Sequence, residues 1–419
     1  MVHAALLVAC GAPSPRTGPG DGEAPVREHP AAAAPETARS DGRAPPSVEG
    51  HDLALPSDSG RAPAAAPGLD GSSWLSWLEA EDEAGRAFMV ARLGPDGVDA
   101  PTEIVAGPHL LANWADVPKV HVLPSGRRVA AWLVRPYELR VAFERKEGGF
   151  SAPVVPHRGS AREFGFPAFF DASGPGEDDE AVGLAWIQDG SVRATLVRPD
   201  GADPPVVLDD RTCECCRVAA LRMADTVFVA YRDRSPDEVR DISLVRLAPT
   251  VPFGVRPPTT PAPVGWRIAG CPVNGPALAA TGSALALARF DGARGGRVEV
   301  LFGEAGARSF GHPRTVDAGH SLGRAALAVG DPDEVVVAWL SAVPAEPGRA
   351  RILVRRVHRT RGLGPVRQVA TTTAGRDAGF PVLARTGADF VVVWTEPDAE
   401  GRLHLAARRF PASSLPAPA

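Results

Sequence analysis

The sequence predicts an all-β protein, a seven-bladed β-propeller built from four-stranded antiparallel blades, and two observations carry this prediction. First, Gly (44) and Pro (43) together make up about a fifth of the 419 residues, which indicates many turns between short strands. Second, one strand–turn–strand phrase recurs along the chain. A six-bladed propeller is the alternative, because the first copy of the phrase contains Pro63 and Pro67.

The recurring phrase is clearest between Gly323 and Trp339, where an apolar strand, a Gly-Asp-Pro turn and a second apolar strand ending on an aromatic residue follow one another. Each copy ends on an aromatic side chain: Trp77, Trp132, Trp186, Tyr231, Phe290, Trp339 and Trp394. Successive aromatics lie 45 to 59 residues apart, a length that suits four short strands and their turns. The spacing therefore predicts one blade per copy.

The last copy provides only three strands before the chain ends. The stretch His51–Leu55 is the expected donor of the fourth strand, because pairing it beside the final blade closes the ring and removes a free sheet edge. We therefore predict a propeller over residues 50–412.

The N-terminal residues 1–10 resemble a lipoprotein signal peptide whose lipobox, Leu7-Val8-Ala9-Cys10, ends at the lipid-anchor residue Cys10. A chance apolar N-terminus is the alternative. Residues 11–49 are rich in Pro, Ala and Gly and predict a disordered tether. We expect an exported protein, either an outer-membrane or cell-surface lipoprotein or a periplasmic one, held at a membrane by its lipid anchor alone.

The formal net charge of −5 provides no excess of basic residues for neutralising phosphates, so we exclude nucleic acid as a partner. We expect a monomer.

Unusual residues gather in the loops that enter each blade and in one charged loop, residues 232–241, which holds three Arg and four acidic residues. In a propeller these loops open on one face, so we expect a common channel mouth. Arg offers a donor fork that suits carboxylate or phosphate. The candidate ligand-binding residues are Arg232, Arg234, Arg240, Asp241, Asn274, Arg324 and Arg376. The alternative is that these charges pair into a structural network.

Four cysteines lie in two adjacent entering loops: Cys213, Cys215, Cys216 and Cys271. In an exported protein the first expectation is disulfides, with one of the three clustered cysteines bonded to Cys271. The alternative is a metal site for zinc or copper, with His320 in support. No cofactor other than this metal is expected.

Four sequence segments resemble those of a family of bacterial secreted or lipoprotein propellers that are described as sialidase-like. They are residues 113–118, 212–216, 231–242 and 266–276. The resemblance spans about Gly68 to Phe410 and implies a sialidase-type propeller. Sialidases use a tyrosine nucleophile assisted by a glutamate, and an aspartate as acid/base. The resemblance thus implies Tyr231, Glu238 and Asp116 as catalytic residues.

Three functions follow from these patterns. The leading hypothesis is a propeller that binds an anionic ligand, a glycan or a protein segment, at the Arg-, Asp- and Cys-lined mouth. The alternatives are an exo-glycosidase of sialidase type and a metal-binding propeller.

Overall fold

The computed structural model describes residues 44–79, 85–157, 164–173, 181–249, 253–304 and 309–418. All of them belong to one compact unit, Arg39–Ala419. Apart from a single 3₁₀ turn, η1 (Ala412–Ser414), the regular structure of these ranges consists of strands. Within the same ranges no helix is long and apolar enough to traverse a lipid bilayer.

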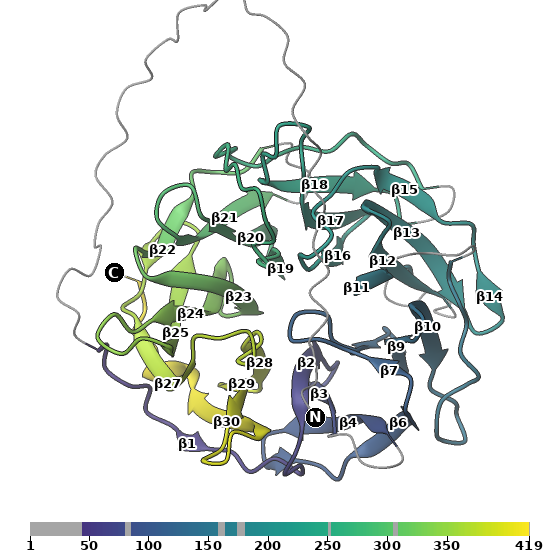
Figure 1. Cartoon of the computed structure of the whole chain (residues 1–419), viewed down its shortest axis with the longest axis horizontal. Helices are drawn as coiled ribbons and strands as arrows, with labels where there is room; N and C mark the ends of the chain where they lie inside the picture. Colours follow the sequence, from purple (N-terminus) through teal and green to yellow (C-terminus); the bar gives the residue numbers. More distant parts are fainter. Residues whose placement is uncertain are drawn as a thin grey trace, which may run out of the picture. The chain divides into compact units, whose positions relative to one another are not determined.

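The strands form seven antiparallel sheets that stand as blades around a central channel (Figure 1), which confirms the seven-bladed prediction over the six-bladed one. The first blade consists of β2 (Arg61–Pro67), β3 (Ser73–Leu78), β4 (Arg86–Gly94), β5 (Gly97–Val98) and β6 (Thr102–Gly107). The second consists of β7 (Leu110–Leu111), β8 (Lys119–Val122), β9 (Arg128–Val134) and β10 (Glu138–Phe143). The third consists of β11 (Phe164–Asp171), β12 (Val182–Gln188), β13 (Ser191–Arg198), β14 (Gly201–Ala202) and β15 (Val206–Asp209).

The fourth blade consists of β16 (Ala219–Met223), β17 (Thr226–Arg232) and β18 (Ile242–Leu247), and a bridge between Leu244 and Thr259 fills its outer position. The fifth consists of β19 (Ala277–Thr281), β20 (Ala284–Asp291), β21 (Arg297–Glu304) and β22 (Arg314–Ala318). The sixth consists of β23 (Ser321–Val329), β24 (Glu334–Ala342), β25 (Arg349–His358), β26 (Gly362–Leu363) and β27 (Arg367–Thr373). The seventh consists of β28 (Val382–Thr386), β29 (Asp389–Pro397), β30 (Leu403–Pro411) and β1 (His51–Asp52).

The ring closes as predicted, because β1 from the N-terminal side pairs with β30 at the C-terminal side. His51 lies opposite Arg409 and Asp52 opposite Arg408, and the Leu53 amide donates to the Ala407 carbonyl at 2.9 Å. Gly50 is required beside this junction, since an added Cβ would lie 2.2 Å from the Arg409 carbonyl oxygen. The C-terminal blade is therefore completed by the other end of the chain.

The core lies between the blades rather than in one central layer. All seven recurring aromatics fall in the second strand of a blade, and Trp77, Trp186 and Trp339 are fully buried. Each buried cluster combines side chains of neighbouring sheets; Trp77 of the first blade, for example, packs with Val391 and Leu405 of the seventh. The repeat is therefore a packing repeat, since each blade buries its faces only against its neighbours.

The predicted signal peptide, Cys10 and residues 11–43 of the predicted tether lie outside the described residues. The last residues of the predicted tether are described, and they contact the propeller. Ser47 forms a bridge with Gln368, and Val48 is buried against the sixth and seventh blades. Contacts with the propeller thus begin a few residues before position 50.

We predict that a chain starting at residue 56 is less stable than one starting at residue 44. The shorter chain loses β1 and buried Val48, which should lower the free energy of unfolding by about 2–4 kcal/mol. Urea denaturation of the two chains measures the difference. Equal midpoints would show that the closing strand contributes nothing to stability.

Candidate functional site

The loops that enter the blades contact one another around one end of the channel, on the side predicted from the sequence. Between the fourth and fifth blades, buried Arg232 of β17 donates from Nε to the Asn274 carbonyl at 2.8 Å. Between the fifth and sixth, the Asn274 side chain accepts from the Arg324 amide at 2.6 Å and donates to the Leu322 carbonyl at 3.1 Å. Between the sixth and seventh, Nη1 of Arg324 donates to the Gly375 and Gly379 carbonyls.

The next contact in this series of entering loops joins the seventh blade directly to the second. Phe380 stacks on Trp114, with ring centroids 6.1 Å apart. Buried Asp116 then accepts the Phe166 amide of the third blade at 2.8 Å, and Nε of Arg217, from the fourth blade, donates to the Ala115 carbonyl at 2.8 Å. We call this ring of loop contacts the collar; its members are Trp114, Asp116, Phe166, Arg217, Arg232, Asn274, Arg324 and Phe380. The collar bypasses the first blade.

The backbone at the mouth is strained. The first strands of the first, third and sixth blades carry register shifts at their mouth ends. In the same places Ala62, Phe166 and Arg324 adopt left-handed φ values of 56°, 58° and 55°, and Val273 does so at 46°. Such conformations are costly for residues other than Gly and concentrate at functional sites. Left-handed residues thus recur in the loops at this end of the channel, as they also do at Ala224 and Asp333 in hairpins between first and second strands.

A pocket of about 180 Å³ lies where the collar passes over the first blade. Its lining combines first-blade residues with collar residues and the loop before β28: Arg61, Ala62, Pro63, Leu78, Arg86, Ala112, Asn113, Trp114, Val117, Arg217, Asp377, Gly379, Phe380, Thr395 and Leu403. Two arginines of the first blade, Arg61 and Arg86, and Arg217 of the loop that enters the fourth blade therefore share one pocket with an aromatic pair and a single described carboxylate, that of Asp377.

Guanidinium groups lie over both rings of the aromatic pair. The Arg217 guanidinium is 3.9 Å from the Phe380 ring centroid, and those of Arg324 and Arg376 are 4.8 and 5.6 Å from the Trp114 ring centroid. Burial lowers the pKa of both Arg217 and Arg324 to about 10, so each remains charged at neutral pH. The pocket wall is therefore positively charged.

Asp116 and Lys119 place two shifted titratable groups beside this wall. Burial raises the pKa of Asp116 to about 6, although the Phe166 amide, Lys119 and Arg217 oppose that shift. Burial, and then the charge of Arg217, lower the pKa of Lys119 to about 7. Shifts of this kind are typical of functional sites, although structural networks produce them too.

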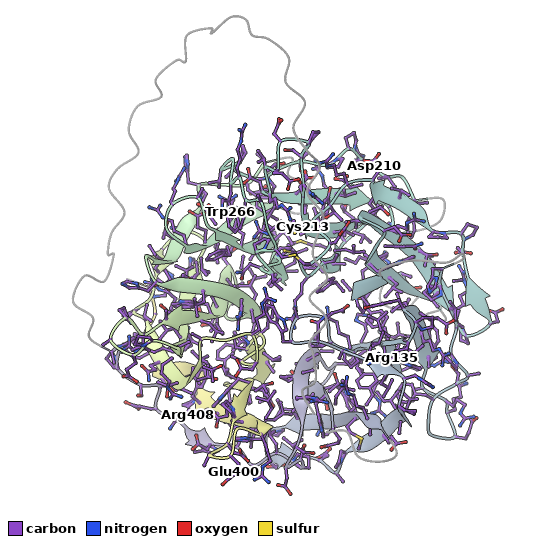
Figure 2. All side chains as sticks on the ribbon, viewed as in Figure 1. Arg135, Asp210, Cys213, Trp266, Glu400 and Arg408 are labelled. Carbon is purple, nitrogen blue, oxygen red and sulfur yellow. The ribbon has the colours of Figure 1, made fainter. Side chains whose placement is uncertain are left out.

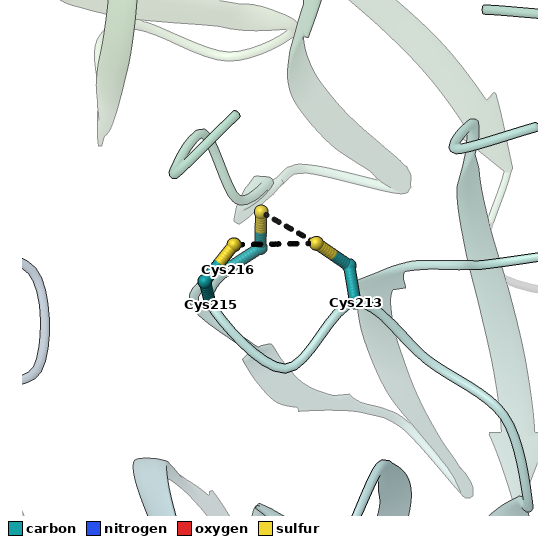
Figure 3. Close-up of side chains that lie close together, drawn as sticks. All are labelled: Cys213, Cys215 and Cys216. Atoms are coloured by element: carbon teal, nitrogen blue, oxygen red, sulfur yellow. Dashed lines mark hydrogen bonds between the residues drawn. The ribbon is translucent and has the colours of Figure 1, made fainter. Parts of the chain in front are cut away.

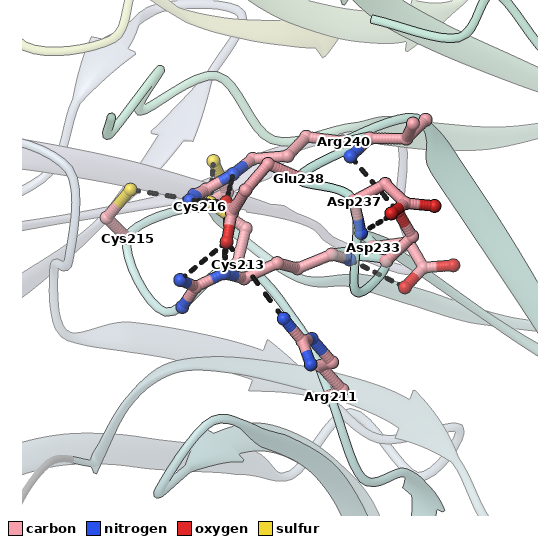
Figure 4. Close-up of polar contacts among 11 residues, drawn as sticks. Arg211, Cys213, Cys215, Cys216, Asp233, Asp237, Glu238 and Arg240 are labelled. Atoms are coloured by element: carbon pink, nitrogen blue, oxygen red, sulfur yellow. Dashed lines mark hydrogen bonds and ion pairs between the residues drawn. The ribbon is translucent and has the colours of Figure 1, made fainter. Parts of the chain in front are cut away.

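The charged loop is organised around Glu238, whose φ is 59°. Its carboxylate accepts from Arg234 at 2.8 Å and from Arg240 at 2.6 Å, and lies 4.0 Å from Arg211 (Figure 4). Asp241 is buried and accepts the amides of Val264, Gly265 and Trp266. In this loop the charged residues that were expected to bind a ligand contact protein groups. This agrees with the alternative that these charges pair into a structural network.

Cys213 follows Thr212, which forms a bridge with Asp233 just after β17, and Figure 2 shows Cys213 on the channel side of this blade. The sulfur of Cys213 lies 3.5 Å from that of Cys215 and 3.4 Å from that of Cys216 (Figure 3). The neighbouring Cys216 thiol, together with Arg240, lowers the pKa of Cys213 to about 6, whereas burial raises the pKa of Cys216. The expected disulfides are not supported, because all four described cysteines are free and Cys271 is exposed.

The three residues of the glycosidase alternative have separate partners. The Tyr231 hydroxyl is fully buried and donates to Asp209 at 2.5 Å, and burial together with Asp209 raises its pKa above the ordinary value. Asp116 bonds the Phe166 amide, and Glu238 bonds arginines. Within the described ranges no hydrogen bond joins any two of the three.

The pocket residues Arg217, Trp114 and Phe380 were not among the candidate site residues of the sequence analysis, and neither was Lys119 beside Asp116. Arg217 directly follows Cys216 in an entering loop, so sorting every cation by loop would have found it. His320, expected to support a metal, is exposed and does not belong to the cysteine cluster.

We predict that Asp116→Asn removes a pH-dependent part of the stability. The pKa of Asp116 is about 6 in the folded protein and lower in the unfolded chain. As the pH falls, the folded wild type therefore takes up a proton at Asp116 at a higher pH than the unfolded chain does. Between pH 7 and pH 5 the wild type should gain about 1 kcal/mol relative to the variant. Urea denaturation at both pH values measures this gain, and parallel pH profiles would contradict the burial of this carboxyl.

We predict that Tyr231→Phe lowers the free energy of unfolding by about 1–2 kcal/mol, since the buried hydrogen bond to Asp209 is lost. Exposed Tyr137, the other tyrosine of the chain, offers the matched control Tyr137→Phe. Release of a fluorogenic sialoside is measured alongside. Turnover that disappears in Tyr231→Phe while stability is unchanged would instead support the nucleophile role.

No family model and no curated protein matches the chain, so membership of the sialidase-like lipoprotein family stays a prediction. Among solved structures, an ulvan lyase bound to -[GlcA(1-4)Rha3S]- matches with a TM-score of 0.53 and 10% identity, over 85% of this chain and 95% of the lyase. A Penicillium chrysogenum α-L-arabinanase matches with a TM-score of 0.45 and 12% identity, over 88% and 100%. A Hadza microbial sialidase matches with a TM-score of 0.41 and 11% identity, over 86% and 67%. The match to the ulvan lyase shows a similar fold.

Proposed function

We propose that the protein binds an acidic glycan in the pocket where the collar passes over the first blade. The observation that carries this proposal is the convergence of Arg61, Arg86 and Arg217 on one pocket beside Trp114. Three guanidinium groups, two from the first blade and one from the fourth, favour an anionic ligand, because they meet at a water-accessible wall of low dielectric.

Arg217 is the residue best placed to contact the anion. Its Nε is held by the Ala115 carbonyl and its plane lies over Phe380. Its two terminal nitrogens have no hydrogen-bond partner in the part of the chain that the structure describes. A guanidinium fixed at Nε with free terminal nitrogens is preorganised to donate to a carboxylate or sulfate.

Trp114 and the pocket size favour a sugar ring as the group that carries the charge. The indole is half-buried in the pocket lining, and Asn113 and Asp377 beside it supply hydrogen-bonding groups. Sugar-binding sites combine an apolar face with a few polar groups in this way. A volume of about 180 Å³ suits the terminal ring of a chain better than a buried oligosaccharide.

Binding is favoured over hydrolysis because Asp377 is the only carboxylate among the described lining residues. Glycosidases of the common type place two carboxyl groups about 5–9 Å apart across the scissile bond. The ulvan lyase of similar fold is bound to a GlcA-containing unit, which recommends uronates as probes.

We further propose that the protein acts outside the cytoplasm. The lipobox at Cys10 and the Pro-rich segment that follows it are the sequence features that support this part of the proposal. A lipid-anchored propeller would meet glycans at the cell surface.

The test is calorimetric titration with uronic-acid and sulfated oligosaccharides, each beside its neutral counterpart. Wild type should bind an acidic member and not its neutral counterpart. Arg217→Ala should weaken binding about tenfold or more, because a charge-assisted hydrogen bond is lost, and Trp114→Ala should weaken it by a similar factor.

Arg145→Ala is the matched control, since Arg145 is an exposed arginine in a hairpin outside the pocket. It should bind as the wild type does. Equal binding of acidic and neutral sugars, or full affinity in both pocket variants, would refute the proposal.

A further inference from the structure

We infer that Cys213, Cys215 and Cys216 form a three-sulfur site for a single copper(I) ion. This inference goes beyond glycan binding and does not depend on it. It stands on the geometry of one turn, on two arginines beside that turn, and on the number of sulfurs that the turn brings together.

The turn is fixed to the innermost part of the fourth blade. The Cys213 amide donates to the Arg232 carbonyl at 2.9 Å, and the Thr212 hydroxyl donates to the same carbonyl at 2.7 Å. The chain then folds back, so that the Cys216 amide faces the Cys213 carbonyl at 3.4 Å. Three sulfurs from four consecutive residues thereby point to one spot (Figure 3).

The sulfur spacing fits a shared ion and not a bond between sulfurs. All three sulfurs lie within 4.8 Å of one another, and the Cys213–Cys215 and Cys213–Cys216 distances are 3.5 and 3.4 Å. A disulfide requires about 2.05 Å. Three sulfurs that each lie about 2.3 Å from one ion stand about 4 Å apart, so small side-chain adjustments suffice.

Two arginines supply the positive charge that three thiolates need. Nη1 of Arg240 lies 3.2 Å from the Cys213 sulfur, and the charge of Arg232 acts on both Cys213 and Cys216. Arg232 is 1% exposed and donates only to neutral carbonyls, those of Asn274, Arg240 and Phe290.

A buried cation without an ion-paired carboxylate calls for another anion nearby. Within the described ranges no carboxylate lies within ion-pair distance of Arg232. An ion bound between Cys213 and Cys216 would displace their protons and place negative charge beside Arg232, on which the charge of Asp241 also acts. This unpaired buried guanidinium is the second, independent observation that favours an anionic sulfur site.

Copper(I) is the metal that this ligand set fits. Thiolates select soft ions, and zinc prefers four ligands in a tetrahedron. The described residues bring three sulfurs together and leave the exposed Cys271 outside the group. Cys213 and Cys216 are buried while Cys215 is partly exposed, which leaves the ion one route of access.

The experiment titrates the anaerobic, reduced protein with copper(I) against a chromophoric copper(I) chelator. Wild type should bind one ion per chain. Cys213→Ser and Cys216→Ser should lose stoichiometric binding, whereas Cys271→Ser, the matched control outside the group, should keep it. Arg240→Ala should weaken binding about tenfold or more, as loss of an outer contact does. Arg234→Ala, which removes a Glu238 partner without touching sulfur, should not.

Because serine at a buried cysteine position can unfold the chain, X-ray absorption of the copper-loaded wild type provides a readout without variants. It should show three sulfur ligands. Two sulfur ligands, or a disulfide between Cys215 and Cys271 that leaves two thiols, would overturn the inference. So would tight zinc binding that Cys271→Ser abolishes, because that result describes a four-sulfur zinc site.

Discussion

Closure of the ring is the constraint on which the rest of this structure depends. No blade buries both of its faces alone, so each sheet is ordered only when its two neighbours are present. The last gap is filled by β1 pairing with β30, which joins residues more than 350 positions apart. Closure also brings loops from every part of the chain to one rim, and this is why residues such as Trp114 and Phe380 can stack.

The contacts of the collar hold the entering loops together at the rim and so form the surface around the pocket. Its arginines satisfy carbonyls of the next loop, as Arg324 does at Gly375 and Gly379, so charges in the rim serve first to hold neighbouring loops together. Because the Trp114–Phe380 stack passes directly from the seventh blade to the second, the first blade lies beneath it and contributes Arg61 and Arg86 to an open pocket. The pocket therefore exists because the collar omits one blade.

The sequence could predict the ring because each blade repeats a strand that ends on an aromatic, and the strand missing after Phe410 identified residues 51–55 as its donor. Entering loops could be assigned to one mouth for the same reason. The separate roles of the arginines could not be predicted. The terminal nitrogens of Arg232 donate to the Arg240 and Phe290 carbonyls, whereas Arg217 is held only at Nε among the described residues, and the sequence does not distinguish the two cases. The disulfides expected from export and cysteine number are not supported, because the turn at residues 213–216 brings three free sulfurs together.

The two proposed sites are chemically distinct yet share a segment of backbone. Arg217 follows Cys216 directly, so the turn that gathers the sulfurs also sets the position from which the guanidinium reaches Ala115 and Phe380. An ion held by three sulfurs would restrict that turn and thus the starting point of the Arg217 side chain. Order at the cysteines would then lower the entropy lost when a ligand fixes the arginine, because part of that ordering would precede binding.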